Sequence, residues 1–151
     1  MKNYIVNTTF VTYMSDIHEN EFFQYVETIR EVKEEILHLR RINDIEIDEI
    51  KKENADLIKD KAFGYLSDVD CILLETSKAH KKILVTDDKK LVKTAMLNEV
   101  MVLNTPRLIT TLAFNGAISY EKALDTLQRL RVYYNRKKAL DKVIKDLENW
   151  R

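Results

Sequence analysis

The chain has 151 residues, of which 45% are hydrophobic and 33% are charged, with two glycines, one proline and one cysteine. This composition is typical of a helix-rich folded domain and excludes a disordered chain, while the lone cysteine, Cys71, excludes an internal disulfide framework. The 25 basic and 25 acidic side chains give no net charge, so no global field attracts nucleic acid, and no apolar stretch reaches the roughly 20 residues of a membrane helix. We therefore expect a cytoplasmic protein in which residues 1–151 form a single domain.

The first half of the chain predicts one strand followed by two helices. The apolar run at 3–6 ends in Asn-Thr-Thr, which indicates a first strand. Apolar residues recur every three or four positions from Glu19 to Arg41, which is the spacing of a helix. Residues 41–48 alternate between apolar and polar, or mark a break between helices, and a second helix is predicted from about Ile47 to Tyr65.

The second half alternates helices with two short strands. Ser67 is a candidate N-cap for a helix over 66–80. The remaining predicted elements are a strand at 82–88, a helix at 89–99, a strand at 100–106, a short helix at 107–119, and two further helices at about 119–133 and 135–149. Strands separated by helices indicate an α/β fold with a short parallel sheet covered on both faces, and 116–151 reads as a helical C-terminal extension.

Polar clusters stand where the predicted strands end and helices begin: 7–9 (Asn-Thr-Thr), 67–70 (Ser-Asp-Val-Asp) and 87–88 (Asp-Asp). In open parallel sheets, ligands bind outside the carboxyl ends of the strands. Each cluster alone can be explained by helix capping, but a helix needs one cap and two of these clusters supply two aspartates. Carboxylates gathered in one pocket repel each other unless a hard cation such as Mg²⁺ or Mn²⁺ neutralises them. The chemistry that such a site favours is metal-assisted phosphodiester hydrolysis.

Three stretches, YIVNTTFVTYM, LSDVDCILLETSKAHKKILVTDDKKL and VMVLNTPRLITTLAFNGAIS, together resemble the PIN-domain nucleases, the fold of VapC-type toxins. The resemblance covers most of residues 3–118 and is most specific over 66–91, where L-S-x-V-D opens a helix and I-L-V-T-x-D ends a strand. It implies a three-layer PIN-like fold and an endoribonuclease that uses Mg²⁺ or Mn²⁺. It also implies a toxin with RNA as substrate, an antitoxin protein as partner and a homodimeric state. The C-terminal helices resemble the tail of a PIN-related subgroup whose role is not settled.

The resemblance assigns roles to particular residues. Asp70 and Asp88 match the family's metal ligands, and the stretch EVKEEIL offers Glu35 first, or Glu34 second, as a third acid. Only one of these two can face a pocket, because helical geometry separates them by about 100°, and both can equally be solvated helix surface. The residues expected to support the site are Thr8, Thr9, Thr86 and Asp87.

Asn7 departs from the family pattern, which has Asp at the end of the first strand. Asn can coordinate a metal through its carbonyl oxygen but brings no negative charge, so metal affinity and activity are expected to fall. Asn7 is either a natural variant or an engineered Asp→Asn substitution made so that a toxic nuclease could be expressed. The alternative to a weakened nuclease is a catalytically inactive PIN-like module that binds protein or RNA.

The C-terminal segment is basic, with eight Lys and Arg against three Asp and Glu in residues 129–151. Tyr133 and Tyr134 lie among these cations and could stack on bases while the cations contact phosphates. The residues predicted to bind RNA are Arg136, Lys137 and Lys138. The alternative is an ordinary amphipathic helix pair anchored by its tyrosines.

Overall fold

The computed structural model describes residues 2–40, 45–51 and 66–150. Within these residues, parallel strands form one five-stranded sheet in the order β3-β2-β1-β4-β5. In the register of the central strand, Tyr4 lies opposite Val26 on one side and Ile83 on the other. The strands are β1 (Tyr4–Val6), β2 (Val26–Thr28), β3 (Asp48–Glu49), β4 (Ile83–Val85) and β5 (Val102–Leu103).

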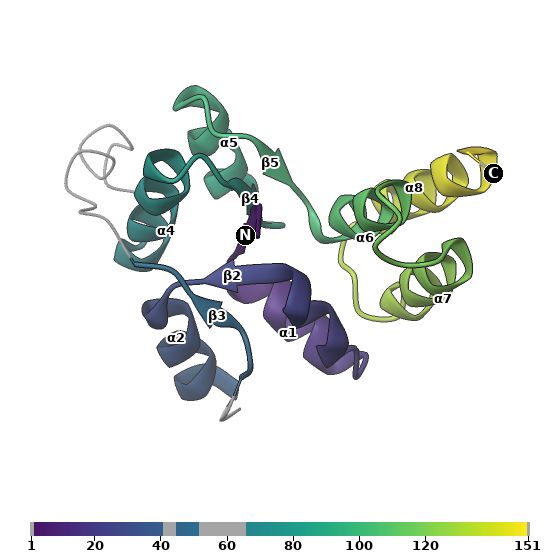
Figure 1. Ribbon diagram of the computed structural model, residues 1–151, viewed down its shortest axis with the longest axis horizontal. Helices are drawn as coiled ribbons and strands as arrows, with labels where there is room; N and C mark the ends of the chain where they lie inside the picture. Colours follow the sequence, from purple (N-terminus) through teal and green to yellow (C-terminus); the bar gives the residue numbers. More distant parts are fainter. Residues whose placement is uncertain (1, 41–44, 52–65, 151) are drawn as a thin grey trace.

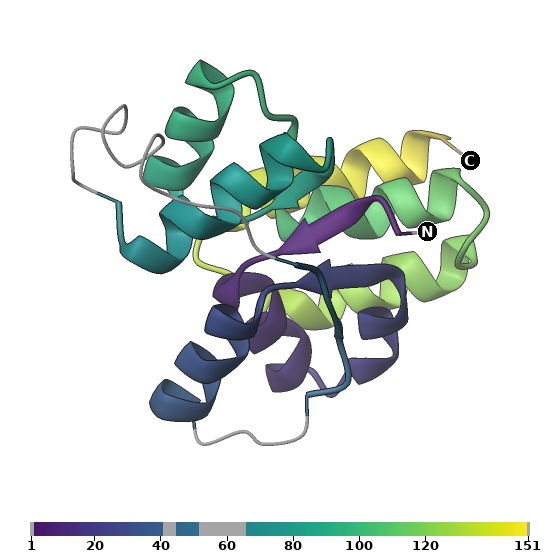
Figure 2. The same cartoon turned by 60° about the vertical axis from the view of Figure 1, so that its left-hand side comes forward.

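Helices cover both faces of this sheet (Figure 1, Figure 2). Helix α1 (Thr8–Asp16) follows β1, α2 (Arg30–Arg40) follows β2, α4 (Asp68–Ala79) precedes β4, and α5 (Lys89–Leu97) follows β4. Because crossovers between parallel strands are right-handed, α1 and α2 lie on one face and α4 and α5 on the other, and the helices of each pair are in contact. The predicted three-layer α/β architecture is confirmed.

The three C-terminal helices, α6 (Thr105–Phe114), α7 (Tyr120–Leu130) and α8 (Lys137–Trp150), pack against one another beside these layers (Figure 1). Within the described residues, no helix combines the length and the apolar surface that a bilayer-spanning segment needs.

An ion cluster joins α7 to the rest of the molecule. The buried carboxylate of Glu19, just before the 3-10 helix η1 (Asn20–Tyr25), lies 2.7 Å from Lys122 Nζ and also pairs with Arg129.

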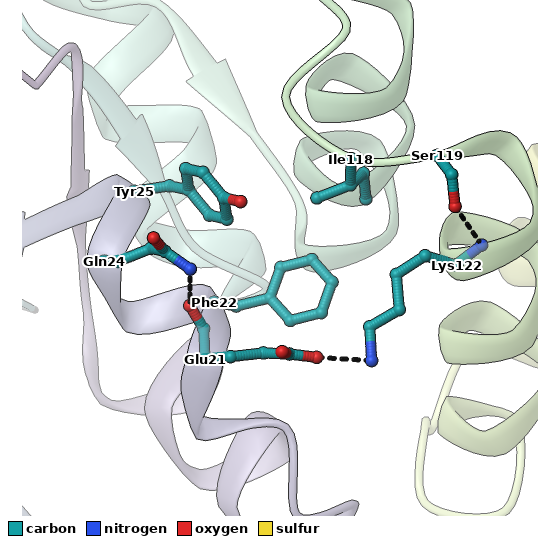
Figure 3. Close-up of a pocket in the computed structure, with 7 residues that line it drawn as sticks. All are labelled: Glu21, Phe22, Gln24, Tyr25, Ile118, Ser119 and Lys122. Carbon is teal, nitrogen blue, oxygen red and sulfur yellow. Dashed lines mark hydrogen bonds and ion pairs between the residues drawn. The ribbon is translucent and has the colours of Figure 1, made fainter.

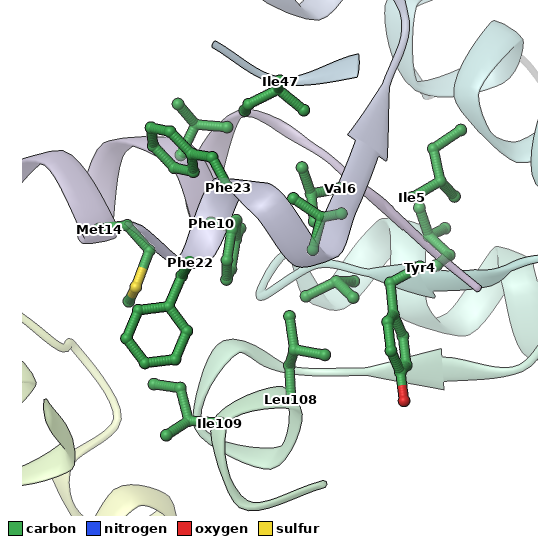
Figure 4. Close-up of a cluster of buried hydrophobic side chains, with 14 of the residues drawn as sticks. Tyr4, Ile5, Val6, Phe10, Met14, Phe22, Phe23, Ile47, Leu108 and Ile109 are labelled. Carbon is green, nitrogen blue, oxygen red and sulfur yellow. The ribbon is translucent and has the colours of Figure 1, made fainter. Parts of the chain in front are cut away.

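One buried apolar cluster holds the sheet, α1, η1 and α6 together (Figure 4). Ile5 and Val6 of the central strand are fully buried, as is Phe10 of α1. Leu108 and Ile109 extend the same cluster from α6. The first C-terminal helix therefore belongs to the core of the domain.

The predicted continuous helix from Glu19 to Arg41 is wrong. The chain instead forms η1, then β2, then α2. Val26 and Thr28 are β-branched and fully buried, and β2 pairs with β1, so tertiary strand pairing overrides the helical spacing of the apolar residues. The sequence pattern also does not predict α1, which begins directly at Thr8.

The second predicted helix is wrong at its start, where Asp48 and Glu49 form β3 and pair with β2. The predicted break near residues 41–44 and the rest of that helix, at 52–65, lie outside the described residues. The remaining predicted elements correspond to β1, α4, β4, α5, β5, α6, α7 and α8.

Candidate functional site

The carboxyl ends of β1 and β4 lie side by side where the path of the chain through the sheet reverses. From β1 the chain continues to β2, and from β4 it continues to β5 on the opposite side. Ligands of open α/β sheets bind at such a switch point. Asn7 follows β1 and residues 86–88 follow β4. The start of α4 lies at the same edge, because this helix runs antiparallel to the strand it precedes.

Asn7 is buried, and its side chain links β1 to the turn after β4. Its Nδ2 donates to Thr86 Oγ1 at 2.6 Å, and its Oδ1 caps α1 by accepting from Thr9 N at 3.2 Å. Thr9 Oγ1 lies 2.7 Å from the same Oδ1. Thr86 Oγ1 also accepts from Asp88 N at 3.2 Å. The amide of Asn7 thus connects the two strand ends.

Three carboxylates from separate segments lie close enough for their charges to interact: Glu35 on α2, Asp70 on α4 and Asp88 at the start of α5. Burial raises the pKa of the Asp70 carboxyl to about 6, and the Asp88 carboxylate adds to this rise. A hydrogen bond with Ser67 opposes it, and Glu35 contributes a smaller increase in the pKa. Glu35 is held in place by Thr8, whose hydroxyl donates to Oε1 at 2.5 Å.

Capping accounts for only part of this acidic cluster, which comprises Glu35, Asp70 and Asp88. Ser67 is the cap of α4, since its hydroxyl accepts from Asp70 N at 3.1 Å. Asp88 caps α5, since its Oδ1 accepts from Lys90 N at 2.9 Å. The Asp70 carboxyl also bonds to Ser67, as in a capping box, but that bond does not offset the rise in its pKa that burial and Asp88 cause.

Asp87 differs from Asp88, because its carboxylate anchors the C-terminal helices to the sheet. Its Oδ1 accepts from the Tyr134 hydroxyl at 2.6 Å and from Thr105 N at 3.0 Å. Its Oδ2 accepts from Thr105 Oγ1 at 2.5 Å and lies 3.1 Å from Thr9 Oγ1. Arg136 donates to its backbone carbonyl at 2.9 Å. With its oxygens so occupied, Asp87 is a structural anchor beside the acidic cluster.

The other residues singled out from the sequence lie around this edge in different ways. Glu34 is exposed and pairs with Arg30 at 2.9 Å, so Glu35 is the glutamate that faces the site. Lys137 Nζ folds back to donate to the Arg131 carbonyl at 2.5 Å. Lys138 is exposed. Of the predicted RNA-binding residues, Arg136 is the one that contacts the site.

Sequence reasoning missed that Thr105 and Tyr134 are the partners of Asp87. They lie 18 and 47 residues from it along the chain, and local spacing cannot reveal contacts at that separation. The available signal was the second aspartate of the Asp87-Asp88 pair, since a helix needs one capping residue. Tyr134 is buried, so it does not stack on bases in the way that one interpretation of the sequence suggested. It serves instead as an anchor, as in the alternative interpretation.

A cavity of about 330 Å³ lies between η1 and α7 (Figure 3). Phe22 and Tyr25 line one side, and Lys122 closes the other through ion pairs with Glu19 and Glu21. Tyr25 directly precedes β2, so this cavity lies toward the amino ends of the strands. It is therefore separate from the acidic cluster.

The donor chemistry of the acidic cluster fits a divalent cation held by few protein ligands. Asp70 and Asp88 offer anionic oxygens, and Mg²⁺ commonly binds through one or two carboxylates while it keeps several waters. Asn7 Oδ1 already accepts from Thr9. Across residues 2–40, 45–51 and 66–150, no three His, Cys, Asp or Glu side chains form a group that could hold a metal ion. The arrangement suits a two-carboxylate site and lacks a complete protein cage among these residues.

Neither a protein-family model nor a curated protein matches the sequence. Among solved structures, the chain is similar to the crystal structure of PAE2754 from Pyrobaculum aerophilum, with a TM-score of 0.58 and 11% sequence identity. The superposition covers 74% of this chain and 97% of the PAE2754 chain. At this identity, the likeness shows a shared fold alone.

Proposed function

We propose that the protein is a divalent-metal-dependent endoribonuclease of the PIN type, the toxin of a toxin–antitoxin pair, and that Asn7 weakens its activity. The observation that supports this proposal best is the convergence of Glu35, Asp70 and Asp88 at the switch point of the sheet. A carboxylate whose charged form is disfavoured by burial and by neighbouring carboxylates, as that of Asp70 is, is stabilised by a hard cation. Such carboxylate–metal sites serve phosphodiester hydrolysis.

In this proposal Asp70 and Asp88 hold Mg²⁺ or Mn²⁺, and Glu35 adds negative charge from α2. When bound, the ion activates a water molecule and neutralises charge that develops on the scissile phosphate. Other residues of the chain hold the acidic side chains in position. Thr8 orients Glu35, and Thr86 holds the backbone at Asp88 together with the side chain of Asn7.

Replacement of Asn7 by Asp restores the family's acid with little steric change. The N–H and hydroxyl of Thr9 already face the oxygen that would be retained. The Thr86 hydroxyl can rotate to donate to the new oxygen, because a hydroxyl both donates and accepts. The substitution therefore adds one negative charge where the proposed ion binds.

We expect Asn7→Asp to raise the cleavage of a labelled single-stranded RNA in the presence of Mn²⁺ by at least about tenfold, which corresponds to about 1.4 kcal/mol in the activation free energy. The matched control is Asn7→Asp combined with Asp88→Asn, which keeps the capping oxygen of α5 but removes a charge. This double variant should cleave no faster than the parent. If Asn7→Asp cleaves no more RNA than the parent, the proposed function is contradicted.

The second candidate function is a catalytically inactive PIN-like module that binds protein or RNA. Asn7 favours it, because Thr9 and Thr86 satisfy the side-chain amide without any ion. For such a module, RNA cleavage stays absent in Asn7→Asp at every Mn²⁺ concentration. The same assay therefore separates the two candidates.

A further inference from the structure

A groove of about 490 Å³ lies along α5, directly beside the acidic cluster. Its volume is within the range of about 300–1,000 Å³ that is usual for ligand pockets. Among the residues that the structure describes, cationic and apolar side chains line it and no acidic one does. The lining residues are Lys89, Val92, Lys93, Met96, Leu97 and Arg136.

Three positive side chains border this α5 groove. Lys89 and Lys93 are one helical turn apart and therefore project from the same face of α5, and Arg136 reaches it from the segment between α7 and α8. Neither lysine forms an ion pair with the described part of the chain. Arg136 bonds to the neutral carbonyl of Asp87. These cations remain available to a polyanion.

The rest of the groove is apolar and open to solvent. Met96 is 68% exposed and Leu97 is 71% exposed, and Val92 lies one turn before Met96 on the same helix face. Large apolar side chains grouped at such exposure mark interaction surfaces. The sulfur of methionine makes favourable contacts with aromatic rings, and every nucleobase offers such a face.

Two of the groove's lining residues lie next to residues at the acidic cluster. Asp88 caps α5 immediately before Lys89, and Arg136 donates to the carbonyl of the adjacent Asp87. An acidic protein segment would also match the lysines, but it would be repelled by Asp88, which directly precedes Lys89. A nucleic acid strand can pass through both regions, because a divalent ion would screen the carboxylates where its scissile phosphate binds.

We infer that the α5 groove binds single-stranded RNA next to the scissile bond. Its phosphates contact Lys89, Lys93 and Arg136, and one base lies on Met96 and Leu97. This inference rests on the proposed ribonuclease function and adds the substrate-binding surface to it. The strand must be single, because only an unstacked base can reach the apolar floor.

The test is the binding of a fluorescein-labelled single-stranded RNA oligonucleotide to the full chain, followed by fluorescence anisotropy in EDTA so that no cleavage occurs. The oligonucleotide is short enough to lie along the groove without crossing the acidic cluster, so its binding does not need a divalent ion. In the double variant Lys89→Gln/Lys93→Gln, we expect affinity to fall at least about tenfold at low salt. The slope of log K against log salt should become shallower by about 1.4, because each phosphate contact to a single strand contributes about 0.7. Arg136→Gln should remove about a further 0.7.

The matched control is Lys78→Gln/Lys145→Gln, which removes two exposed lysines outside the groove, one on α4 and one on α8. It should bind RNA like the parent. Equal affinity and slope in the groove variant and this control would overturn the inference, as would a parent chain that binds no RNA at low salt. A groove variant that binds RNA normally but changes its oligomeric state in light scattering would assign the groove to protein contact, and would overturn it too.

This experiment fails independently of the proposed activity. If RNA binding depends on the groove but Asn7→Asp does not cleave RNA, the groove is supported as an RNA-binding site and the proposed nuclease activity is contradicted. If Asn7→Asp cleaves RNA equally well with and without Lys89→Gln/Lys93→Gln, the nuclease activity is supported and the inference about the groove is contradicted.

Discussion

The charged form of Asp70 destabilises the folded chain. Burial first, and the Asp88 carboxylate second, raise the pKa of its carboxyl from 3.8 to about 6. Between these values the folded chain binds this proton more tightly than the unfolded chain, so the free energy of unfolding falls as pH rises. The loss is complete above the folded-state pKa and amounts to at most about 3 kcal/mol, at about 1.4 kcal/mol for each unit of pKa.

The substitution Asp70→Asn removes this penalty. We expect the variant to match the parent in free energy of unfolding near pH 4 and to exceed it by about 2 to 3 kcal/mol near pH 8. Urea unfolding at the two pH values measures the difference. Asp68→Asn, two residues away and exposed, serves as the control and should show no such gain at high pH. A constant difference between Asp70→Asn and the parent across this pH range would contradict the assignment.

For individual residues, the sequence predicted which side chains lie at the carboxyl edge of the sheet but not the role of each one. Asp87 and Asp88 are adjacent, and both end the same strand. Their roles separate because Tyr134 and Thr105 take the oxygens of Asp87, while the charge of Asp88 raises the pKa of the Asp70 carboxyl. The direction of each side chain depends on partners distant in the chain, which spacing within a short motif does not encode.

Among the elements, β1, β4, β5 and the helices from α4 onward were predictable, whereas α1, β2 and β3 were not. Ser67, with Asp70 three residues later, marks the start of α4 correctly. β2 has three residues inside a region of helical apolar spacing, and only its pairing with β1 distinguishes it. β1 and β4 are equally short, but each is an apolar run that ends in polar residues, whereas β2 carries Glu27 between its two buried residues and lacks such a run. Its existence depends on the rest of the sheet.

The contact between the α7–α8 segment and the turn after β4 gives a prediction at the scale of elements. Tyr134 is buried, and its hydroxyl donates to the carboxylate of Asp87. Tyr134→Phe should lower the free energy of unfolding by about 1.5 to 3 kcal/mol, the usual range for a hydrogen bond to a charged group. Denaturant unfolding near neutral pH measures this loss.

Tyr133→Phe is the matched control for that substitution, because Tyr133 is the neighbouring residue and is 47% exposed. It should change stability by no more than about 0.5 kcal/mol. Equal losses in the two variants would show that the hydroxyl of Tyr134 does not anchor the C-terminal helices to the sheet.

For the whole molecule, the alternation of strands and helices was enough to predict the three-layer fold, but not the order of its strands. The site depends on that order. β1 and β4 are neighbours although 76 residues separate their ends, and this pairing brings Asn7 to Thr86. The net charge of zero also hides how the charges are distributed. The negative side chains of the acidic cluster and the positive side chains of the α5 groove lie next to each other, and an overall count of charges does not reveal this.

A divalent ion should therefore stabilise the whole fold by relieving repulsion within the acidic cluster. We expect Mn²⁺ to raise the melting temperature of Asn7→Asp more than that of the parent, because the added carboxylate strengthens both the repulsion and the binding. At a concentration about 100 times Kd, binding contributes about 2.7 kcal/mol, or roughly 5–10 °C for a chain of this size. Adding Asp88→Asn should abolish most of the shift, and adding Asp68→Asn should preserve it. If Asn7→Asp melts at the same temperature with and without Mn²⁺, these carboxylates hold no ion and the proposed metal site is contradicted.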